Sequence, residues 1–189
     1  MKYYFLLFTL LFSFSAISQV KYETIYSEKL GEDREIKIQL PRNYESNSEK
    51  RYPIFIVLDG DYLFEPVAGN VDFYSYWEDM PEAIVVGINQ LETRIDDGYF
   101  DDTNYFPSNS GANFFEFIGL ELLPYLDTNY RTAKFVIAVG HDYTSNFINY
   151  YLFKDPALFQ GYINLSPDFA PMMAERLTEK LSTIKQKTW

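Results

Sequence analysis

The stretch that most limits the possible folds of this chain runs from Lys134 to Leu152. Residues 135–139 form an apolar run rich in β-branched side chains, which ends at Gly140. A helical pattern begins within about four residues of that glycine. This order predicts a buried strand, a tight turn at residues 140–144 and a helix. Such a turn lifts one side chain above the edge of a sheet, over the N-terminus of the following helix.

Three other apolar runs, at residues 54–58, 83–88 and 162–165, also have the length of buried strands. Segments with a helical pattern or length separate the four runs. Strict alternation of strand and helix predicts an α/β fold with a mainly parallel sheet and helices on both faces.

The first part of the chain has a different pattern. Residues 22–27 and 35–40 are β-like, and Gly31-Glu32-Asp33 between them is typical of a turn. Residues 35–40 alternate between polar and apolar side chains, as expected of a half-buried strand. We therefore expect an antiparallel hairpin at one edge of the sheet.

The N-terminus has the features of an export signal. Residues 1–18 carry one lysine, an apolar core from Tyr3 to Phe12 and small side chains at Ala16 and Ser18. The apolar core is shorter than the ~20 residues that cross a membrane. We expect residues 1–18 to be a cleaved signal peptide and residues 19–189 to form one domain, exported to the periplasm or secreted without a membrane anchor.

Charge and composition limit the partners. The net charge of −11 and the lack of clustered lysine and arginine argue against a nucleic-acid partner. The chain has no cysteine, so a disulfide framework is excluded. Asp96, Asp97, Asp101 and Asp102 match no calcium-loop spacing, so we interpret them as an exposed acidic loop and predict no metal or cofactor.

Aromatic residues make up 19% of the chain, which is more than a core requires. We expect some of these rings to lie in loops, where they can stack on a ligand; the alternative is that they only enlarge the core. The candidates for lining a pocket are Phe64, Tyr76 and Trp77, all in the segment that follows residues 54–58.

The chain resembles the secreted esterases of the α/β-hydrolase superfamily, the group that includes enterochelin esterases, esterase D and feruloyl or acetylxylan esterases. The segments that carry the resemblance are the turn at residues 140–144, REIKIQLPRNY, YPIFIVLDGDYLF, SGANFFEFIGLELLPYLDTNYR and KDPALFQGYINLSPDF. The resemblance implies an α/β-hydrolase fold and a carboxylic-ester hydrolase that acts on a small-molecule ester or glycoside-like ligand.

In that family the turn is a nucleophile elbow with the pattern G-x-S-x-G, and its serine works with a histidine and an acid. Two backbone amides bind the oxyanion. Transferred to this chain, the resemblance implies Tyr143 as one oxyanion donor and Asp61 or Tyr62 as the other.

The elbow of this chain reads Gly140-His141-Asp142-Tyr143-Thr144, so Asp142 occupies the nucleophile position and Thr144 replaces the last glycine. His141 is the only histidine, and a residue next to the nucleophile is poorly placed to act as its base. The family's acid and histidine follow further strands, which we expect to be missing after residue 189.

We therefore expect an esterase-like protein that is inactive as given. The alternative is a pseudoenzyme that binds a sugar, an aryl ester or a siderophore-like ligand without turnover. A more distant alternative is a hydrolase that uses Asp142 itself as the nucleophile, as haloalkane dehalogenases and epoxide hydrolases do.

Overall fold

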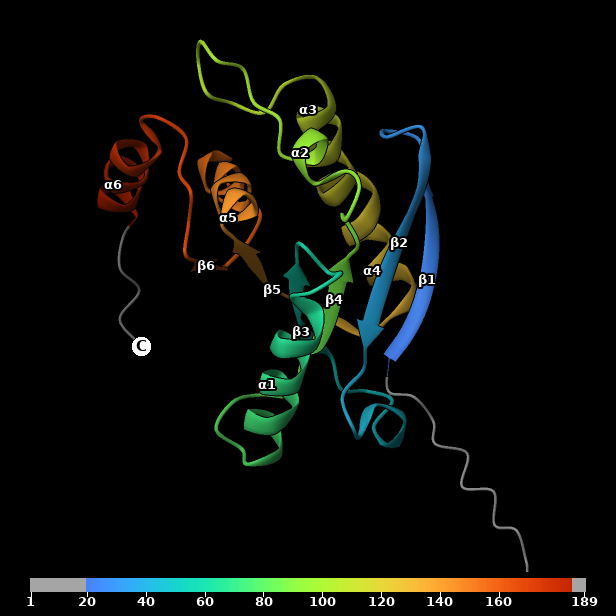
Figure 1. Cartoon of the computed structure of the whole chain (residues 1–189). Coiled ribbons are helices and arrows are strands. Elements are labelled where there is room, and N and C mark those ends of the chain that lie inside the picture. The colour runs from blue at the N-terminus through green and yellow to red at the C-terminus, as the bar shows by residue number, and fades with distance from the viewer. Residues whose placement is uncertain (1–19, 185–189) are drawn as a thin grey trace, which may run out of the picture.

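The fold is built on one six-stranded sheet, seen in a computed structural model that describes residues 20–184 (Figure 1). The strands in chain order are β1 (Val20–Ser27), β2 (Glu32–Gln39), β3 (Tyr52–Val57), β4 (Ile84–Ile88), β5 (Thr132–His141) and β6 (Gly161–Leu165). Across the sheet their order is β1-β2-β4-β3-β5-β6. The pairs β1–β2 and β2–β4 are antiparallel, whereas β4, β3, β5 and β6 are mutually parallel. The predicted edge hairpin and mainly parallel sheet are confirmed.

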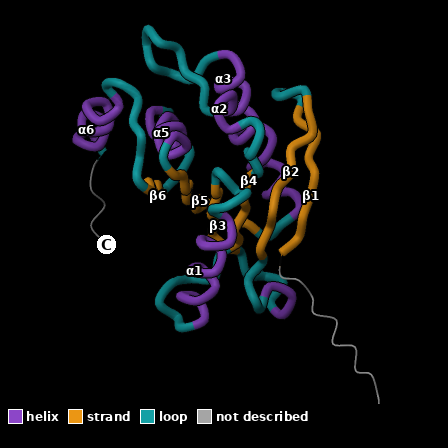
Figure 2. Tube along the Cα trace, viewed as in Figure 1, coloured by secondary structure: helices purple, strands orange, loops and turns teal. Residues whose placement is uncertain are grey.

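Helices occupy the connections between the strands from β2 to β6, and one more follows β6 (Figure 2). They are η1 (Tyr44–Ser46), α1 (Phe64–Tyr76), α2 (Arg94–Asp97), α3 (Asn109–Glu116), the π-helical segment η2 (Phe117–Leu122), α4 (Leu123–Asn129), α5 (Tyr143–Ile148), η3 (Asn149–Phe153) and α6 (Met173–Thr183). The helix predicted after the elbow is present, although it continues as the 3₁₀ helix η3.

The two faces of the sheet bury different side chains of the same strands. In β3, Ile54 and Ile56 pack under α3, η2, α4 and α5, while Phe55 and Val57 pack under α1. Successive side chains of a strand point to opposite faces, so a strand buried on both faces must be apolar throughout. This confirms the prediction that helices cover both faces.

The parallel strands present their carboxyl ends at one edge of the sheet. Asp59, Gly60 and Asp61 follow β3 at this edge, and the elbow follows β5. Gly60 approaches β4 so closely that an added Cβ would lie 2.8 Å from the backbone nitrogen of Ile88. Ligand sites of open α/β sheets lie at this edge, so the fold directs the search for a site to these segments.

One expectation about the loop after β4 is wrong. Residues 89–110 are not wholly an exposed acidic loop, because they contain α2, and Asp97 at its end is buried. The Asp97 carboxylate pairs with the Arg34 guanidinium of β2 at 2.6 Å. The interaction crosses 63 residues of sequence, so no local pattern indicated it.

The expected signal peptide, residues 1–18, lies outside the described residues. Among residues 20–184, no helix has the length and hydropathy needed to cross a bilayer.

Candidate active site

The elbow has the sharp backbone geometry that its sequence predicts. Asp142 has φ 55° and ψ −117°, and Tyr143 begins α5 directly after it. The Asp142 side chain is 47% exposed, so the turn presents a carboxylate to solvent. The Asp142 amide donates to the Leu165 carbonyl at 2.9 Å, and the Asp168 amide donates to the Asp142 carbonyl at 3.1 Å. The end of β6 and the residues after it therefore hold the elbow in place.

Gly140 and Thr144 make this turn possible. A Cβ on Gly140 would lie 2.7 Å from the carbonyl group of Thr144, so the helix can start this close to the strand only beside a glycine. Thr144 is buried, and its hydroxyl accepts a hydrogen bond from the His141 amide at 3.0 Å. The same hydroxyl donates to Asp59 Oδ2 at 2.7 Å, which connects the elbow to the loop after β3.

Asp59 is the centre of the hydrogen-bond network at this edge. It is 1% exposed and has φ 54°, a left-handed conformation that is uncommon for a residue other than glycine. Its amide donates a hydrogen bond to Gln90 Oε1 at 2.9 Å. Its carboxylate accepts hydrogen bonds from Thr144, Tyr62 and Arg94. A buried carboxylate needs this many donors to offset its lost hydration.

Arg94 of α2 supplies the positive charge of the network. Its Nε lies 2.7 Å from Asp59 Oδ1, and its Nη2 donates to the His141 carbonyl at 3.0 Å. Nη2 also lies 3.4 Å from Asp142 Oδ2. Although partial burial lowers the pKa of Arg94, its hydrogen bond and charge interaction with Asp59 raise that pKa above the ordinary value. The guanidinium therefore joins the loop after β3 to both residues of the elbow.

His141 and Tyr62 are in direct contact. The Tyr62 hydroxyl lies 2.8 Å from His141 Nδ1 and 3.0 Å from Asp59 Oδ2. The two rings meet edge to face, with centroids 5.8 Å apart. Partial burial, with the Asp59 carboxylate beside the phenol, raises the pKa of Tyr62 to about 12.

The three predicted oxyanion donors differ in availability. The Tyr62 amide already donates to the Asp59 carbonyl at 3.1 Å. As the first residue of α5, Tyr143 has an amide that no carbonyl of its own helix can accept. The Asp61 amide has no acceptor within residues 20–184, while the Asp61 carboxylate accepts from the Gln90 amide at 2.6 Å. Tyr143 and Asp61 are therefore the pair whose amides remain open.

The structure does not bring the predicted pocket residues to the elbow. Phe64 is 1% exposed and packs in the core between α1 and the sheet. Tyr76 and Trp77 lie at the far end of α1, which carries the chain ~20 Å in its 13 residues. Figure 1 shows α1 running away from the arrowheads of β3 and β4. Tyr76 instead lies against the Arg42 guanidinium and lines a different cavity with it.

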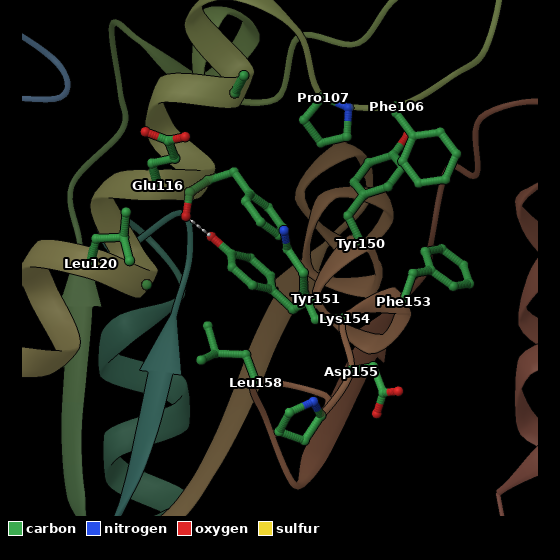
Figure 3. Close-up of a pocket in the computed structure, with 14 residues that line it drawn as sticks. Phe106, Pro107, Glu116, Leu120, Tyr150, Tyr151, Phe153, Lys154, Asp155 and Leu158 are labelled. Atoms are coloured by element: carbon green, nitrogen blue, oxygen red, sulfur yellow. Dashed lines mark hydrogen bonds between the residues drawn. The ribbon is translucent and has the colours of Figure 1, made fainter.

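A separate cavity of about 730 Å³ lies between η2 and η3 (Figure 3). One side of the cavity is lined by the aromatic rings of Phe106, Tyr150 and Phe153. The aliphatic side chain of Leu120 lies on the other side. Neither Asp142 nor the residues that contact it line this cavity.

Sequence reasoning missed three residues of the site: Asp59, Gln90 and Arg94. Each lies just beyond the carboxyl end of β3 or β4. Because carboxyl ends of neighbouring parallel strands meet at one edge, charged and amide side chains at these positions are the signal that could have indicated them. Among the described residues, no group of three His, Cys, Asp or Glu side chains is placed to hold a metal ion.

Strand order, helices on both faces and an elbow after the fifth strand together define an α/β-hydrolase-like protein. The family model described as Putative esterase matches residues 27–186, so the chain belongs to that family.

Solved structures agree with this assignment. An uncharacterised protein from Capnocytophaga ochracea is 30% identical, with a TM-score of 0.80, over 86% of this chain and 44% of that protein. An IroE-like serine hydrolase from Shewanella oneidensis is 26% identical, with a TM-score of 0.73, over 86% of this chain and 56% of that one. The BES protein from Bacillus cereus is 26% identical, with a TM-score of 0.71, over 90% of this chain and 72% of that protein. This chain thus spans about half the length of the first two. No curated protein sequence matches it.

Proposed function

We propose that this protein binds a small-molecule carboxylic ester over the elbow and does not hydrolyse it through a covalent acyl-enzyme. The observation that carries the proposal is the conformation of Asp142, whose half-exposed carboxylate stands where the family's serine would stand. The open amides of Tyr143 and Asp61 are the proposed binding groups for the ester carbonyl oxygen.

Among the described residues, the geometry gives Asp142 no base that could support it as a nucleophile. Within residues 20–184, Arg94 is the one side chain within hydrogen-bond distance of its carboxylate, and a guanidinium cannot act as a base at neutral pH. The members of a catalytic triad act as a unit, so one member without its partners recovers little of the rate.

The test is hydrolysis of p-nitrophenyl acetate by the wild type, Asp142→Ala and Asp142→Ser. We expect equal rates for the wild type and Asp142→Ala, because the carboxylate does not take part in bond formation. Asp142→Ser should recover at most a weak rate, because nothing bound to residue 142 can accept its proton. Saturable turnover that Asp142→Ala abolishes would make Asp142 a working nucleophile and contradict the proposal.

We also propose that the protein is exported and that residues 1–18 are removed, leaving residues 19–189 as one α/β-hydrolase-like domain. The short apolar core and the small side chains at Ala16 and Ser18 support this proposal. N-terminal sequencing of exported protein should begin near Gln19, and a sequence beginning at Met1 would contradict it.

A further inference from the structure

The position of one proton determines what His141 can do. The Tyr62 hydroxyl lies between Asp59 Oδ2, at 3.0 Å, and His141 Nδ1, at 2.8 Å. A phenol has one proton to donate, whereas a carboxylate only accepts. If Tyr62 donated to His141, its oxygen would face the Asp59 carboxylate with no proton between them.

The other arrangement satisfies every group. Tyr62 donates to Asp59, and the Tyr62 oxygen accepts a hydrogen bond from Nδ1–H of His141. Arg94 Nε donates to the same carboxylate at 2.7 Å, so Asp59 is the acceptor of this network. The pKa of about 12 for Tyr62 agrees, since its phenol then keeps its proton at neutral pH.

This arrangement leaves His141 Nε2 without a proton. The imidazole is partly exposed, and Nε2 has no hydrogen-bond partner within residues 20–184. We propose that His141 is the proton acceptor of this site, through Nε2, and that Tyr62 and Asp59 are positioning residues that hold its Nδ1 protonated.

The proposal rests on the proposed ester-binding function for its substrate. A water molecule attacks the ester carbonyl and forms the new C–O bond, and its proton passes to Nε2. The tetrahedral intermediate then breaks its bond to the alcohol oxygen, which takes the proton back from the imidazolium. The carboxylic acid and the alcohol leave, and His141 is neutral again. This slow route needs no covalent intermediate and makes no use of the Asp142 carboxylate.

Four charged or titratable groups surround the imidazole. Tyr62 and Asp59 face it from the loop after β3, and Arg94 of α2 binds its backbone carbonyl. Asp142 is its neighbour in the elbow. Because a general base acts only in its unprotonated form, the rate should rise with pH.

Nitrogen-15 NMR of the whole chain, prepared without a histidine tag, tests the proton position directly. His141 is the only histidine, so every imidazole signal belongs to it. We expect the neutral ring of the wild type to carry its proton on Nδ1, the reverse of the preference of free histidine. Tyr62→Phe should shift the ring toward the Nε2–H form, whereas Tyr22→Phe, an exposed control on β1, should leave the spectrum unchanged. A wild-type ring protonated on Nε2, or a spectrum unaffected by Tyr62→Phe, would overturn the proposal.

Hydrolysis of p-nitrophenyl acetate supplies the second readout. His141→Gln should lower the rate at least ~10-fold, because a positioned general base contributes roughly 10²–10⁴-fold. Tyr62→Phe should give a smaller loss together with a displaced pH profile, and Tyr22→Phe should match the wild type. An unchanged rate in His141→Gln would overturn the role of the imidazole. A loss of rate in Asp142→Ala would instead contradict the proposed function and leave the NMR result standing.

Discussion

Asp142 holds a backbone conformation that disfavours any residue with a Cβ. Its φ of 55° with ψ of −117° lies outside the regions that L-residues populate readily. Such a conformation costs about 1–3 kcal/mol and persists only where the surrounding structure imposes it. Here the hydrogen bonds of its amide and carbonyl to Leu165 and Asp168 impose it from both sides. The strain is a property of the position and does not depend on which side chain stands there.

Replacing Asp142 by glycine should therefore give a more stable protein than replacing it by alanine. Both changes remove the carboxylate, so the comparison isolates the backbone. We expect the free energy of unfolding of Asp142→Gly to be ~1 kcal/mol larger than that of Asp142→Ala. The relief of backbone strain should outweigh the larger chain entropy of glycine in the unfolded state. Urea unfolding of the two variants measures the difference. Equal stability would show that the elbow is not strained.

At the scale of the elements, close contact between β5 and α5 depends on Gly140. The space for a Cβ is already occupied by the backbone of Thr144 and Ser145, 2.7–2.8 Å away. Backbone atoms at this distance cannot give way as the end of a flexible side chain could. Gly69 of α1 is the opposite case, because a Cβ there would meet nothing within 4 Å.

The two glycines should therefore respond to alanine with opposite signs. Gly140→Ala should destabilise the fold by ~1–3 kcal/mol, as expected when atoms are forced into a packed site. Gly69→Ala should stabilise it by ~0.5–1 kcal/mol, because alanine favours the helix interior. Thermal unfolding of both variants gives the comparison. A Gly140→Ala variant as stable as the wild type, or more stable, would contradict the packing described for the elbow.

At the scale of the whole molecule, the Arg34–Asp97 pair joins the antiparallel strand β2 to α2, which also carries Arg94. Both side chains are 4% exposed. Burial raises the pKa of Asp97 even though the hydrogen bond and charge of Arg34 lower it. Desolvation thus outweighs attraction, so the pair is costly to break but adds little net stability compared with apolar side chains.

Arg34→Met should lower the free energy of unfolding by ~3–5 kcal/mol, because it leaves a buried carboxylate without its partner. The double variant Arg34→Met/Asp97→Leu should recover most of that loss. Lys29→Met, which breaks the exposed pair with Glu116, is the control and should change stability little. Guanidinium unfolding of the four proteins measures these differences. A double variant as unstable as Arg34→Met would contradict the account.

Local sequence patterns were enough to predict the strands, the hairpin and the elbow. Burial on one or both faces of a strand sets its pattern of apolar residues, and the turn at residues 140–144 needs Gly140 at its start. These requirements act over a few residues, so the hairpin, the four parallel strands and the position of Asp142 could be predicted.

The contacts between side chains of distant segments follow from the folded arrangement of the strands and helices. Asp59, Arg94 and His141 come from three segments that become neighbours only because β3 lies between β4 and β5. The length of α1 likewise took Tyr76 and Trp77 away from the elbow, and pairing with Arg34 buried Asp97. The spacing of apolar residues indicates which face of a helix or strand is buried. Contacts between distant segments depend on strand order and helix length, and no local pattern of residues contains them.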